Sequence, residues 1–274
     1  MNWMKTTLMM AMVSGGVFGA EPVACFDFNE VSGFKLPNRV GNDDLTVLYD
    51  SVAFDGSGDG PQLIEGRPGG GSAMQFNPGY NGDGPIGVLV SSSRAYDFGR
   101  DDFVVSGWFR SENVEDAVVP AGQTPEHRWI FNTARGNHDG IAVGLVRDGI
   151  NPKGKLQFSV NGEDKIILMS KSRLDDNQWH WFAGVVENEE LSLYIDGRLN
   201  GAVEYKPKTS ASATSDLFIG AQTANESANP FSGDIDDIFV CRGSLSAELG
   251  TRSGLTGGEL YVLWTEGPQS FLKD

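Results

Sequence analysis

Short stretches that alternate between apolar and polar residues recur along the chain, and Gly, Asn and Asp residues separate them. Alternation with a period of two places the apolar side chains on one face of a β-strand. Asp196 and Gly197 follow one such stretch, and this pair is typical of a type I′ hairpin turn, which requires positive φ angles. The pattern predicts strands at residues 24–29, 103–109, 129–131, 141–146, 155–160, 179–186, 191–195, 217–220 and 238–241.

Helical periodicity is absent from the long segments of the sequence. One short helix is expected near the end of the chain, where Thr256 and Glu259 have the spacing of a capping box and Leu260 and Leu263 follow. Many strands, frequent turns and almost no helix predict an all-β fold built as a sandwich or a barrel.

The first 20 residues have the features of a secretory signal peptide. Lys5 precedes a short apolar run at residues 8–13, and Gly19 and Ala20 supply the small residues of a cleavage site. The run is shorter than the ~20 apolar residues that span a bilayer, and no later segment reads as transmembrane. We therefore expect a signal peptide at 1–20, a single domain at 21–274, and a secreted protein in the extracellular space or the periplasm.

The chain is strongly acidic, because 37 Asp and Glu residues against 21 Lys and Arg residues give a formal net charge of −16. This charge repels nucleic acid and anionic membrane surfaces, so nucleic acid is not an expected partner. It favours solubility outside the cell and offers oxygen ligands to divalent cations. A zinc site is not expected, because the chain has only two Cys and three scattered His residues.

Several stretches resemble the bacterial laminin-G-like domains, which have the fold of the concanavalin A-like lectins and glucanases. The sequence FDFNE at 26–30 is similar to the opening strand of that family, and GSAMQFN at 71–77 to the strand after the first loop. In the middle, WHWFAGV at 179–185 leads to LSLYIDG at 191–197, as in the family's central hairpin. Near the end, FSGDIDDI at 231–238 is similar to the last strand.

The resemblance spans residues 22–265 and implies a two-sheet antiparallel jelly-roll sandwich whose first and last strands are neighbours. It leaves the ligand open, because one fold of this kind hosts many functions. We expect a secreted, non-catalytic binding module for carbohydrate or a surface glycoconjugate. The alternatives are a structural or adhesion module of the cell envelope or matrix, with an extracellular protein as partner, and a glucanase-type glycoside hydrolase.

The acidic run near the end and the His of the central motif are the candidates for catalysis. Glucanases on this sandwich use a Glu nucleophile and a Glu acid on one strand, whereas Asp234, Asp236 and Asp237 have no Glu beside them. Trp179 and His180 fall on opposite faces of a predicted strand, as expected for a packed Trp and a hydrogen-bonded structural His. We predict no catalytic residue and do not expect an enzyme.

A structural calcium ion is the cofactor that the resemblance suggests, because some related sandwiches bind one. Asp27, Asn29 and Asp237 are the candidate ligands, since the first and last strands should be neighbours. Residues 55–60 match the first half of an EF-type loop, but the Glu required at position 12 is missing. Ordinary turns and solvated acids are the alternative at both places.

Sugar binding calls for aromatic rings that stack on the sugar and for polar groups beside them. Tyr80 lies in a Gly- and Asn-rich loop with Asn81 and Asp83, so these three are the candidate ligand-binding residues. Trp108 and Trp179 are expected in the core.

Cys25 and Cys241 are expected to form a disulfide in an exported chain. The resemblance makes the first and last strands antiparallel neighbours. Alternation then places both Cys residues on the face opposite to Phe26 and Val240. Directly opposed residues have Cα atoms ~4.5–5.5 Å apart, which a disulfide can span. Two thiols are the alternative.

Overall fold

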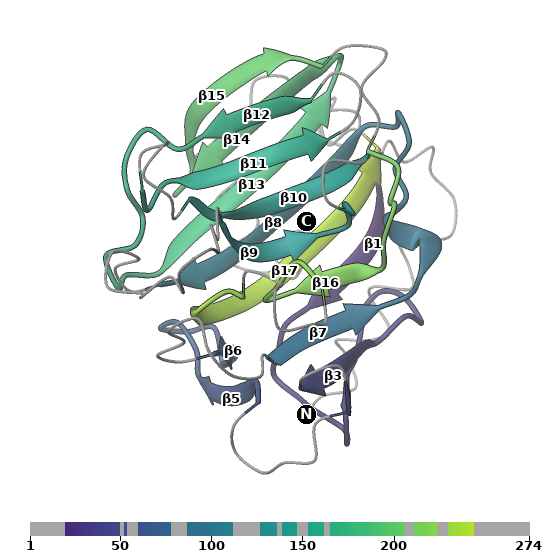
Figure 1. The fold of residues 1–274 in the computed structure, drawn as a ribbon, viewed down its shortest axis with the longest axis vertical. Helices are drawn as coiled ribbons and strands as arrows, with labels where there is room; N and C mark the ends of the chain where they lie inside the picture. Colours follow the sequence, from purple (N-terminus) through teal and green to yellow (C-terminus); the bar gives the residue numbers. More distant parts are fainter. Residues whose placement is uncertain are drawn as a thin grey trace, which may run out of the picture.

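The computed structural model describes residues 20–49, 52–53, 60–77, 87–111, 127–135, 139–146, 153–161, 165–205, 211–223 and 230–243. Within these residues, two antiparallel sheets pack face to face as a sandwich (Figure 1). One 3₁₀ turn, η1 at Arg94–Tyr96, is capped by Ser93, whose Oγ accepts a hydrogen bond from the Ala95 N–H at 3.1 Å. In this described part, no helix has the length and apolar character needed to cross a membrane.

Among the described residues, sheet A has eight strands in the order β15-β14-β13-β8-β17-β6-β5, and β1 also pairs with β17. The strands are β1 Ala20–Phe26, β5 Gln62–Glu65, β6 Ser72–Phe76, β8 Phe103–Arg110, β13 His180–Glu187, β14 Glu190–Ile195, β15 Arg198–Glu204 and β17 Gly233–Gly243. Strand β17 is long enough to hold β6 along its first residues and β1 along its last ones.

In the part of the chain that the structure describes, sheet B has nine strands in the order β12-β11-β10-β9-β16-β7-β3-β2, and β4 also pairs with β3. The strands are β2 Lys35–Leu36, β3 Leu45–Tyr49, β4 Val52–Ala53, β7 Gly87–Ser91, β9 His127–Asn132, β10 Gly140–Val146, β11 Leu156–Asn161, β12 Ile166–Met169 and β16 Leu217–Ile219. Every strand pair in both sheets is antiparallel.

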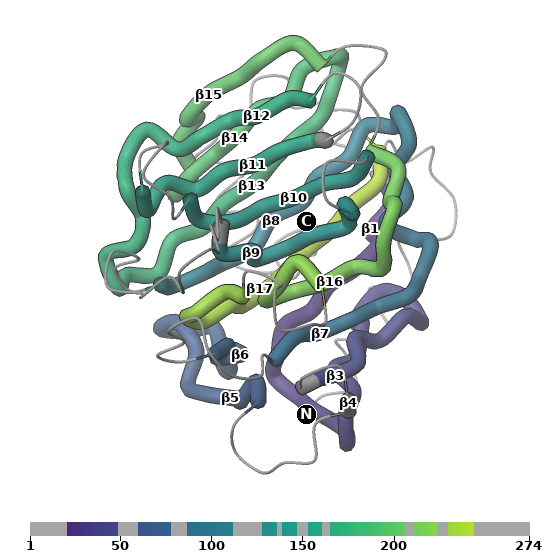
Figure 2. The backbone as a smooth tube through the Cα atoms, viewed as in Figure 1, coloured from purple at the N-terminus to yellow at the C-terminus, as the bar shows by residue number. Residues whose placement is uncertain are grey.

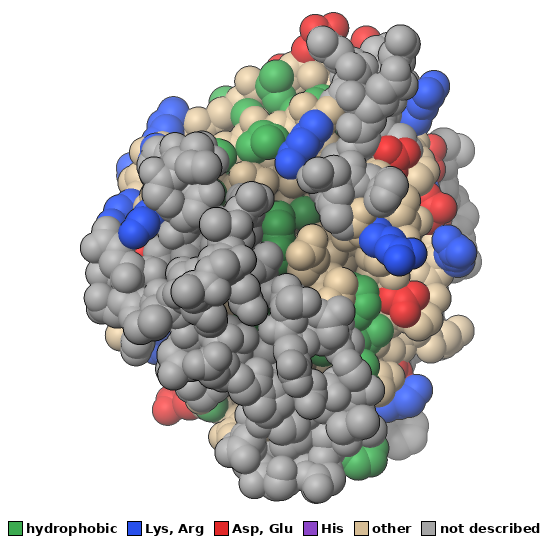
Figure 3. Space-filling view, viewed as in Figure 1, with side chains coloured by type: hydrophobic (Ala, Val, Ile, Leu, Met, Phe, Trp, Pro, Cys, Tyr) green, Lys and Arg blue, Asp and Glu red, His purple; other side chains and the backbone are tan. Residues whose placement is uncertain are grey.

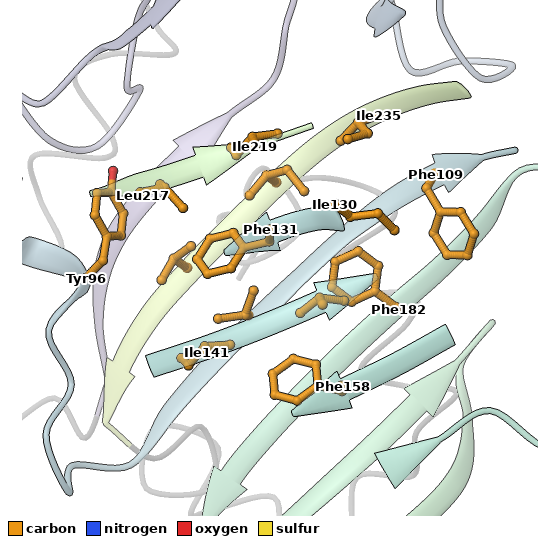
Figure 4. Close-up of a cluster of buried hydrophobic side chains, with 14 of the residues drawn as sticks. Tyr96, Phe109, Ile130, Phe131, Ile141, Phe158, Phe182, Leu217, Ile219 and Ile235 are labelled. Carbon is orange, nitrogen blue, oxygen red and sulfur yellow. The ribbon is translucent and has the colours of Figure 1, made fainter. Parts of the chain in front are cut away.

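The main hydrophobic core fills the space between the two sheets. Figure 4 shows side chains from sheet A, among them Phe109 and Phe182, pointing toward Phe131, Ile141 and other side chains of sheet B. These side chains are completely or almost completely buried. The alternating strands seen in the sequence therefore supply the inner faces of a sandwich, as predicted.

The predicted all-β jelly-roll sandwich is confirmed, and so are two of its local features. Asp196 and Gly197 both have positive φ angles, of 48° and 73°, as a type I′ turn between β14 and β15 requires. Strands β1 and β17 are antiparallel neighbours, and Figure 2 shows these purple and yellow segments side by side.

The predicted disulfide between Cys25 and Cys241 is wrong, because both residues are buried thiols. Their strands pair and neither Cys belongs to the core between the sheets, as expected. The register differs, however: Cys25 lies opposite Phe239, and Cys241 lies opposite Pro22, beyond an irregularity between Pro22 and Ala24. Residues offset in this way are ~7–8 Å apart, which exceeds the span of a disulfide.

We expect two thiols per chain when protein purified without reductant is unfolded and titrated with Ellman's reagent. In the folded protein the reaction should be slow, because both side chains are buried and burial, together with the charge of Asp237, raises the pKa of the Cys25 thiol to about 12. An unfolded chain with no titratable thiol would contradict this and restore the disulfide.

Candidate functional site on the outer face of sheet A

A second apolar cluster lies on the outer face of sheet A, the face turned away from sheet B. Side chains alternate along β8, so Trp108 points outward while its neighbour Phe109 enters the main core. The cluster consists of Val104, Trp108, Trp181, Ala183, Val185 and Cys241, with Trp179, Tyr194 and Phe239 packed against it. Trp181 is only 2% exposed, so this face is built as a second packed layer.

Strand register places an acidic residue at the end of a row of indoles. Trp181 of β13 lies opposite Trp108 of β8, and Trp108 lies opposite Asp236 of β17. Residues directly opposite each other in a sheet share one face. Any two of these three residues are more than 50 positions apart in the sequence, and only the order of the strands brings them together.

The adjacent row of the same face is polar and partly exposed, and we call Gln75, Arg110, Trp179 and Asp234 the outer-face patch. Arg110 Nε donates to Asp234 Oδ2 at 2.7 Å, and Gln75 Nε2 donates to Asp234 Oδ1 at 3.2 Å. The guanidinium carbon of Arg110 lies 5.1 Å from the centre of the Trp179 ring, and the Arg110 side chain is 34% exposed. The patch thus combines an aromatic ring with oriented donors and a carboxylate.

Asp236 is a buried carboxyl group without a hydrogen-bond partner among the described residues. Arg67 approaches this carboxyl group, with Arg67 Nε 3.8 Å from Asp236 Oδ2, while Arg67 Nη2 pairs with Asp237. Burial and the negative charge of Asp237 raise the pKa of Asp236 to about 8, against the lowering effect of Arg67. The buried environment therefore favours the protonated form of Asp236 more than the surroundings of an ordinary Asp do.

The turn between β5 and β6 closes over Asp236 because it is rich in Gly. A Cβ atom on Gly70 would lie 3.0 Å from Asp236 Oδ2 and 2.6 Å from Arg67 Cγ, so no larger residue fits there without a shift. Arg67 itself lies over Trp108, with its guanidinium carbon 4.7 Å from the ring centre. The turn thereby fixes a guanidinium between an indole and two carboxyl groups.

The three predicted calcium ligands make their contacts with protein groups. Both carboxylate oxygens of Asp27 share the single N–H of Arg39 Nε, at 3.0 and 3.1 Å, and Asp237 pairs with Arg67. Asn29 Oδ1 accepts a hydrogen bond from the Ser72 N–H at 2.8 Å. No group of three or more Asp, Glu, His or Cys residues in the described part is placed to hold a metal ion. Asp27 and Asp237 each pair with an Arg side chain here, and calcium binding by these residues stays a prediction.

His180 makes two hydrogen bonds, as its predicted structural role requires. Its Nδ1 lies 2.8 Å from Asp196 Oδ2, and its Nε2 lies 3.1 Å from Asp176 Oδ1. Burial lowers the pKa of His180, but the hydrogen bonds and charges of Asp196 and Asp176 outweigh it, so the pKa is raised above its usual value. The imidazole therefore joins the turn at Asp196 to the segment that precedes β13.

Several predicted features fall outside the described residues and stay predictions. They are the signal peptide up to residue 19, the half EF-type loop apart from Gly60, the candidate sugar-binding residues Tyr80, Asn81 and Asp83, and the short helix after Thr256. The outer-face patch was missed because Trp179 reads as a core residue and Asp234 as part of an acidic run. The spacing of Asp234 and Asp236, two apart on a strand, was the available signal that both face one side.

Comparison with known proteins extends the description of the fold. A laminin-G-like family model, described as the concanavalin A-like lectin/glucanases superfamily, matches residues 87–248. No curated protein matches the chain in sequence. Domain 4 of an extracellular arabinanase from Geobacillus stearothermophilus, in complex with arabinotriose, has a TM-score of 0.58 and 16% identity, covering 90% of this chain and 99% of that domain.

Two toxin structures are similar to the same degree. The binding domain of Paraclostridial Mosquitocidal Protein 1 has a TM-score of 0.58 and 16% identity, covering 85% of this chain and 52% of that one. A structure of botulinum neurotoxin type C, whose cell entry depends on two ganglioside molecules, has a TM-score of 0.58 and 13% identity, covering 89% and 51%. The chain thus spans about half the length of these toxin chains. Because the family model covers more than half of the chain, this protein belongs to the concanavalin A-like lectin/glucanases superfamily.

Proposed function

We propose that this protein is a non-catalytic module that binds a carbohydrate or a glycoconjugate through the outer-face patch. The observation that carries the proposal is the placement of Trp179 beside the Arg110–Asp234 pair, on a face of the sheet that is partly open to solvent. A partly exposed indole can stack on the C–H face of a sugar ring. The paired guanidinium and carboxylate, with the Gln75 amide, can donate to and accept from neighbouring hydroxyls.

Similar folds support this choice of ligand class. The arabinanase domain holds arabinotriose, and the neurotoxin depends on gangliosides for cell entry. Because the sequence identities are only 16% and 13%, these similarities support the class of ligand and leave the particular sugar open. The acidic run Asp234 to Asp237 is assigned to the patch and to the Arg67 network, so we propose no glycosidase activity for it.

We expect Trp179→Ala to weaken binding of the glycans that the native protein captures on a glycan array by about 10-fold or more, because the stacking surface is lost. Calorimetric titration of the best array ligand measures the loss. Phe34→Ala is the matched control, since Phe34 is an exposed aromatic residue outside sheet A. Equal affinities of the native protein and Trp179→Ala for that ligand would contradict the proposed site.

A protein partner is the second candidate, and the exposed apolar residues at one end of the sandwich favour it. Ile167 on β12 and Leu199 and Val203 on β15 are exposed, and Leu199 is 50% exposed. Figure 3 shows hydrophobic side chains at the upper end of the molecule, where Figure 1 places these two edge strands. Edge strands with apolar side chains are common contact surfaces. An adhesion role predicts that Leu199→Glu abolishes capture of a protein partner while Trp179→Ala leaves it intact.

We also propose that the protein is secreted, because its first 20 residues have the features of a signal peptide, and that it holds a structural calcium ion. An exported binding module would meet glycans and glycoconjugates on surfaces outside the cell. An acidic chain suits that setting, because its charge keeps it soluble.

A further inference from the structure

His180 is held between two carboxylates that come from two different turns. Asp196 belongs to the turn between β14 and β15, and its other oxygen, Oδ1, accepts a hydrogen bond from the Trp181 N–H at 2.9 Å. Asp176 belongs to the segment before β13, and its Oδ1 also accepts a hydrogen bond from the Gln178 N–H at 3.0 Å. The imidazole therefore connects the turn between β14 and β15 to the segment that precedes β13.

The hydrogen-bond chemistry of this arrangement depends on the charge of the imidazole. A carboxylate only accepts hydrogen bonds, and a neutral imidazole donates from one nitrogen alone. Both ring nitrogens of His180 face carboxylate oxygens, at 2.8 and 3.1 Å. Both bonds form together only when His180 is the doubly protonated imidazolium. Loss of that proton leaves one nitrogen lone pair facing a carboxylate, so one of the two contacts must open.

The segment that Asp176 anchors carries the aromatic residue of the outer-face patch. Asn177 N–H donates to the Ser111 carbonyl at 3.0 Å, next to Arg110 on β8. Trp179 follows two residues later, directly before His180, and lies under the Arg110 guanidinium. His180 itself points to the other side, against Phe109, with 6.0 Å between ring centres. Releasing Asp176 from His180 therefore loosens the short segment that sets the position of Trp179.

We propose that His180 is a positioning residue of the carbohydrate site: its imidazolium clamps Asp176 to Asp196 and thereby holds Trp179 in place, so that binding weakens as the pH rises. This inference rests on the proposed function of the outer-face patch. It adds a pH dependence in which the bound state is favoured in mildly acidic to neutral surroundings.

The pH range follows from the groups around His180. The charges that raise its pKa belong to Asp196 and Asp176, and the residue of β8 opposite His180 is the uncharged Phe109. Arg110 is paired with Asp234, and Arg173 with Asp175, so these charges are compensated locally. A folded pKa above the unfolded value of ~6.5 makes the clamp complete below about pH 6 and weakens it as the pH passes through the raised pKa.

The first test measures the clamp without any ligand. We expect hydrogen-exchange protection of the Asn177 and Gln178 amides, corrected for the intrinsic pH dependence of exchange, to fall about 5-fold or more between pH 6 and pH 9. In His180→Gln the protection of these backbone amides should be low and independent of pH, because the Gln side chain does not titrate. Asp216→Asn is the control and should behave like the native protein, since Asp216 is a distant acid that accepts a hydrogen bond from Ser92 Oγ.

The second test measures binding, with arabinotriose as the probe. We expect its affinity to fall about 3-fold or more from pH 6 to pH 9 in the native protein, with no such fall in His180→Gln. Protection and affinity that stay constant with pH in the native protein would overturn the positioning role. If arabinotriose fails to bind at every pH while the protection changes as expected, the clamp stands and the parallel with the arabinanase domain loses its support. A pH profile of protection in His180→Gln equal to that of the native protein would overturn the clamp.

Discussion

Replacing Gly184 with Ala is expected to destabilise the protein by about 3 kcal/mol, as overpacking of a tightly filled core does. Gly184 lies in the middle of β13, where the sheet faces sheet B. A Cβ atom at this position would lie 2.0 Å from Cε2 and 2.2 Å from Cζ of Phe158 on β11. Phe158 is completely buried in the main core, so its ring has no space into which it could move.

Gly201→Ala is the matched control for this substitution. Gly201 also lies inside a strand of sheet A, β15, but its added Cβ atom would meet only Leu168 Cδ2, at 3.4 Å. The control should be neutral or slightly stabilising, because Ala restricts the unfolded chain more than Gly does. Urea unfolding of the two variants measures the difference. Similar stabilities of Gly184→Ala and the native protein would mean that β13 and β11 are further apart than the structure places them.

Local sequence patterns were sufficient to predict the class of the fold. Alternation identified the inner strands, and the Asp196-Gly197 pair identified a hairpin turn, because both signals depend on residues close together in the chain. The neighbouring positions of β1 and β17 came from the resemblance to a family. Periodicity by itself contains no information about which strands pair.

The predicted disulfide failed for a reason that alternation cannot detect. Alternation correctly assigned Cys25 and Cys241 to strands that pair and to positions outside the main core. Whether the two residues meet depends on the register, and an irregularity between Pro22 and Ala24 shifts it. Pro22 has no backbone N–H to donate to the ladder, which is a reason for pairing to become irregular at this point.

The outer-face patch could not be predicted, because its members come from four separate parts of the chain. Gln75, Arg110, Trp179 and Asp234 belong to or adjoin four different strands, and they meet only through the order β13-β8-β17-β6. In the sequence, Trp179 is part of a family motif and was assigned to the core. Its partial exposure depends on which residues of other strands lie beside it, which is a tertiary property.

Replacing Asp236 with Asn is expected to stabilise the protein at pH 8 by about 2–4 kcal/mol. Asp236 is completely buried, neither of its oxygens has a hydrogen-bond partner in the described part of the chain, and burial with the charge of Asp237 raises its pKa to about 8. Folding at neutral pH therefore forces an acid that is ionised in the unfolded chain to take up a proton. Asn has the same shape and needs no proton, so it removes this cost.

The sign of the pH dependence follows from proton uptake. Between the unfolded pKa of ~3.9 and the folded value of about 8, the folded protein holds one proton more than the unfolded chain at this site. Its contribution to stability therefore falls as the pH rises, by up to ~1.4 kcal/mol per pH unit. Asp236→Asn should match the native protein near pH 4 and exceed it increasingly toward pH 8. Urea unfolding at pH 4.5, 6 and 8 measures both the gain and the slope.

Asp234→Asn is the control two residues away on the same face of β17. Asp234 accepts hydrogen bonds from Arg110 and Gln75, so its carboxylate is satisfied and the loss of its charge should destabilise the protein by about 1–3 kcal/mol. The two substitutions have the same chemistry and opposite expected effects, because the carboxyl group of Asp234 accepts hydrogen bonds and that of Asp236 accepts none from the described residues. If Asp236→Asn instead lowered the stability at pH 8, Asp236 would be an ionised partner of Arg67, and the 3.8 Å between Arg67 Nε and Asp236 Oδ2 would have to be read as a stabilising ion pair.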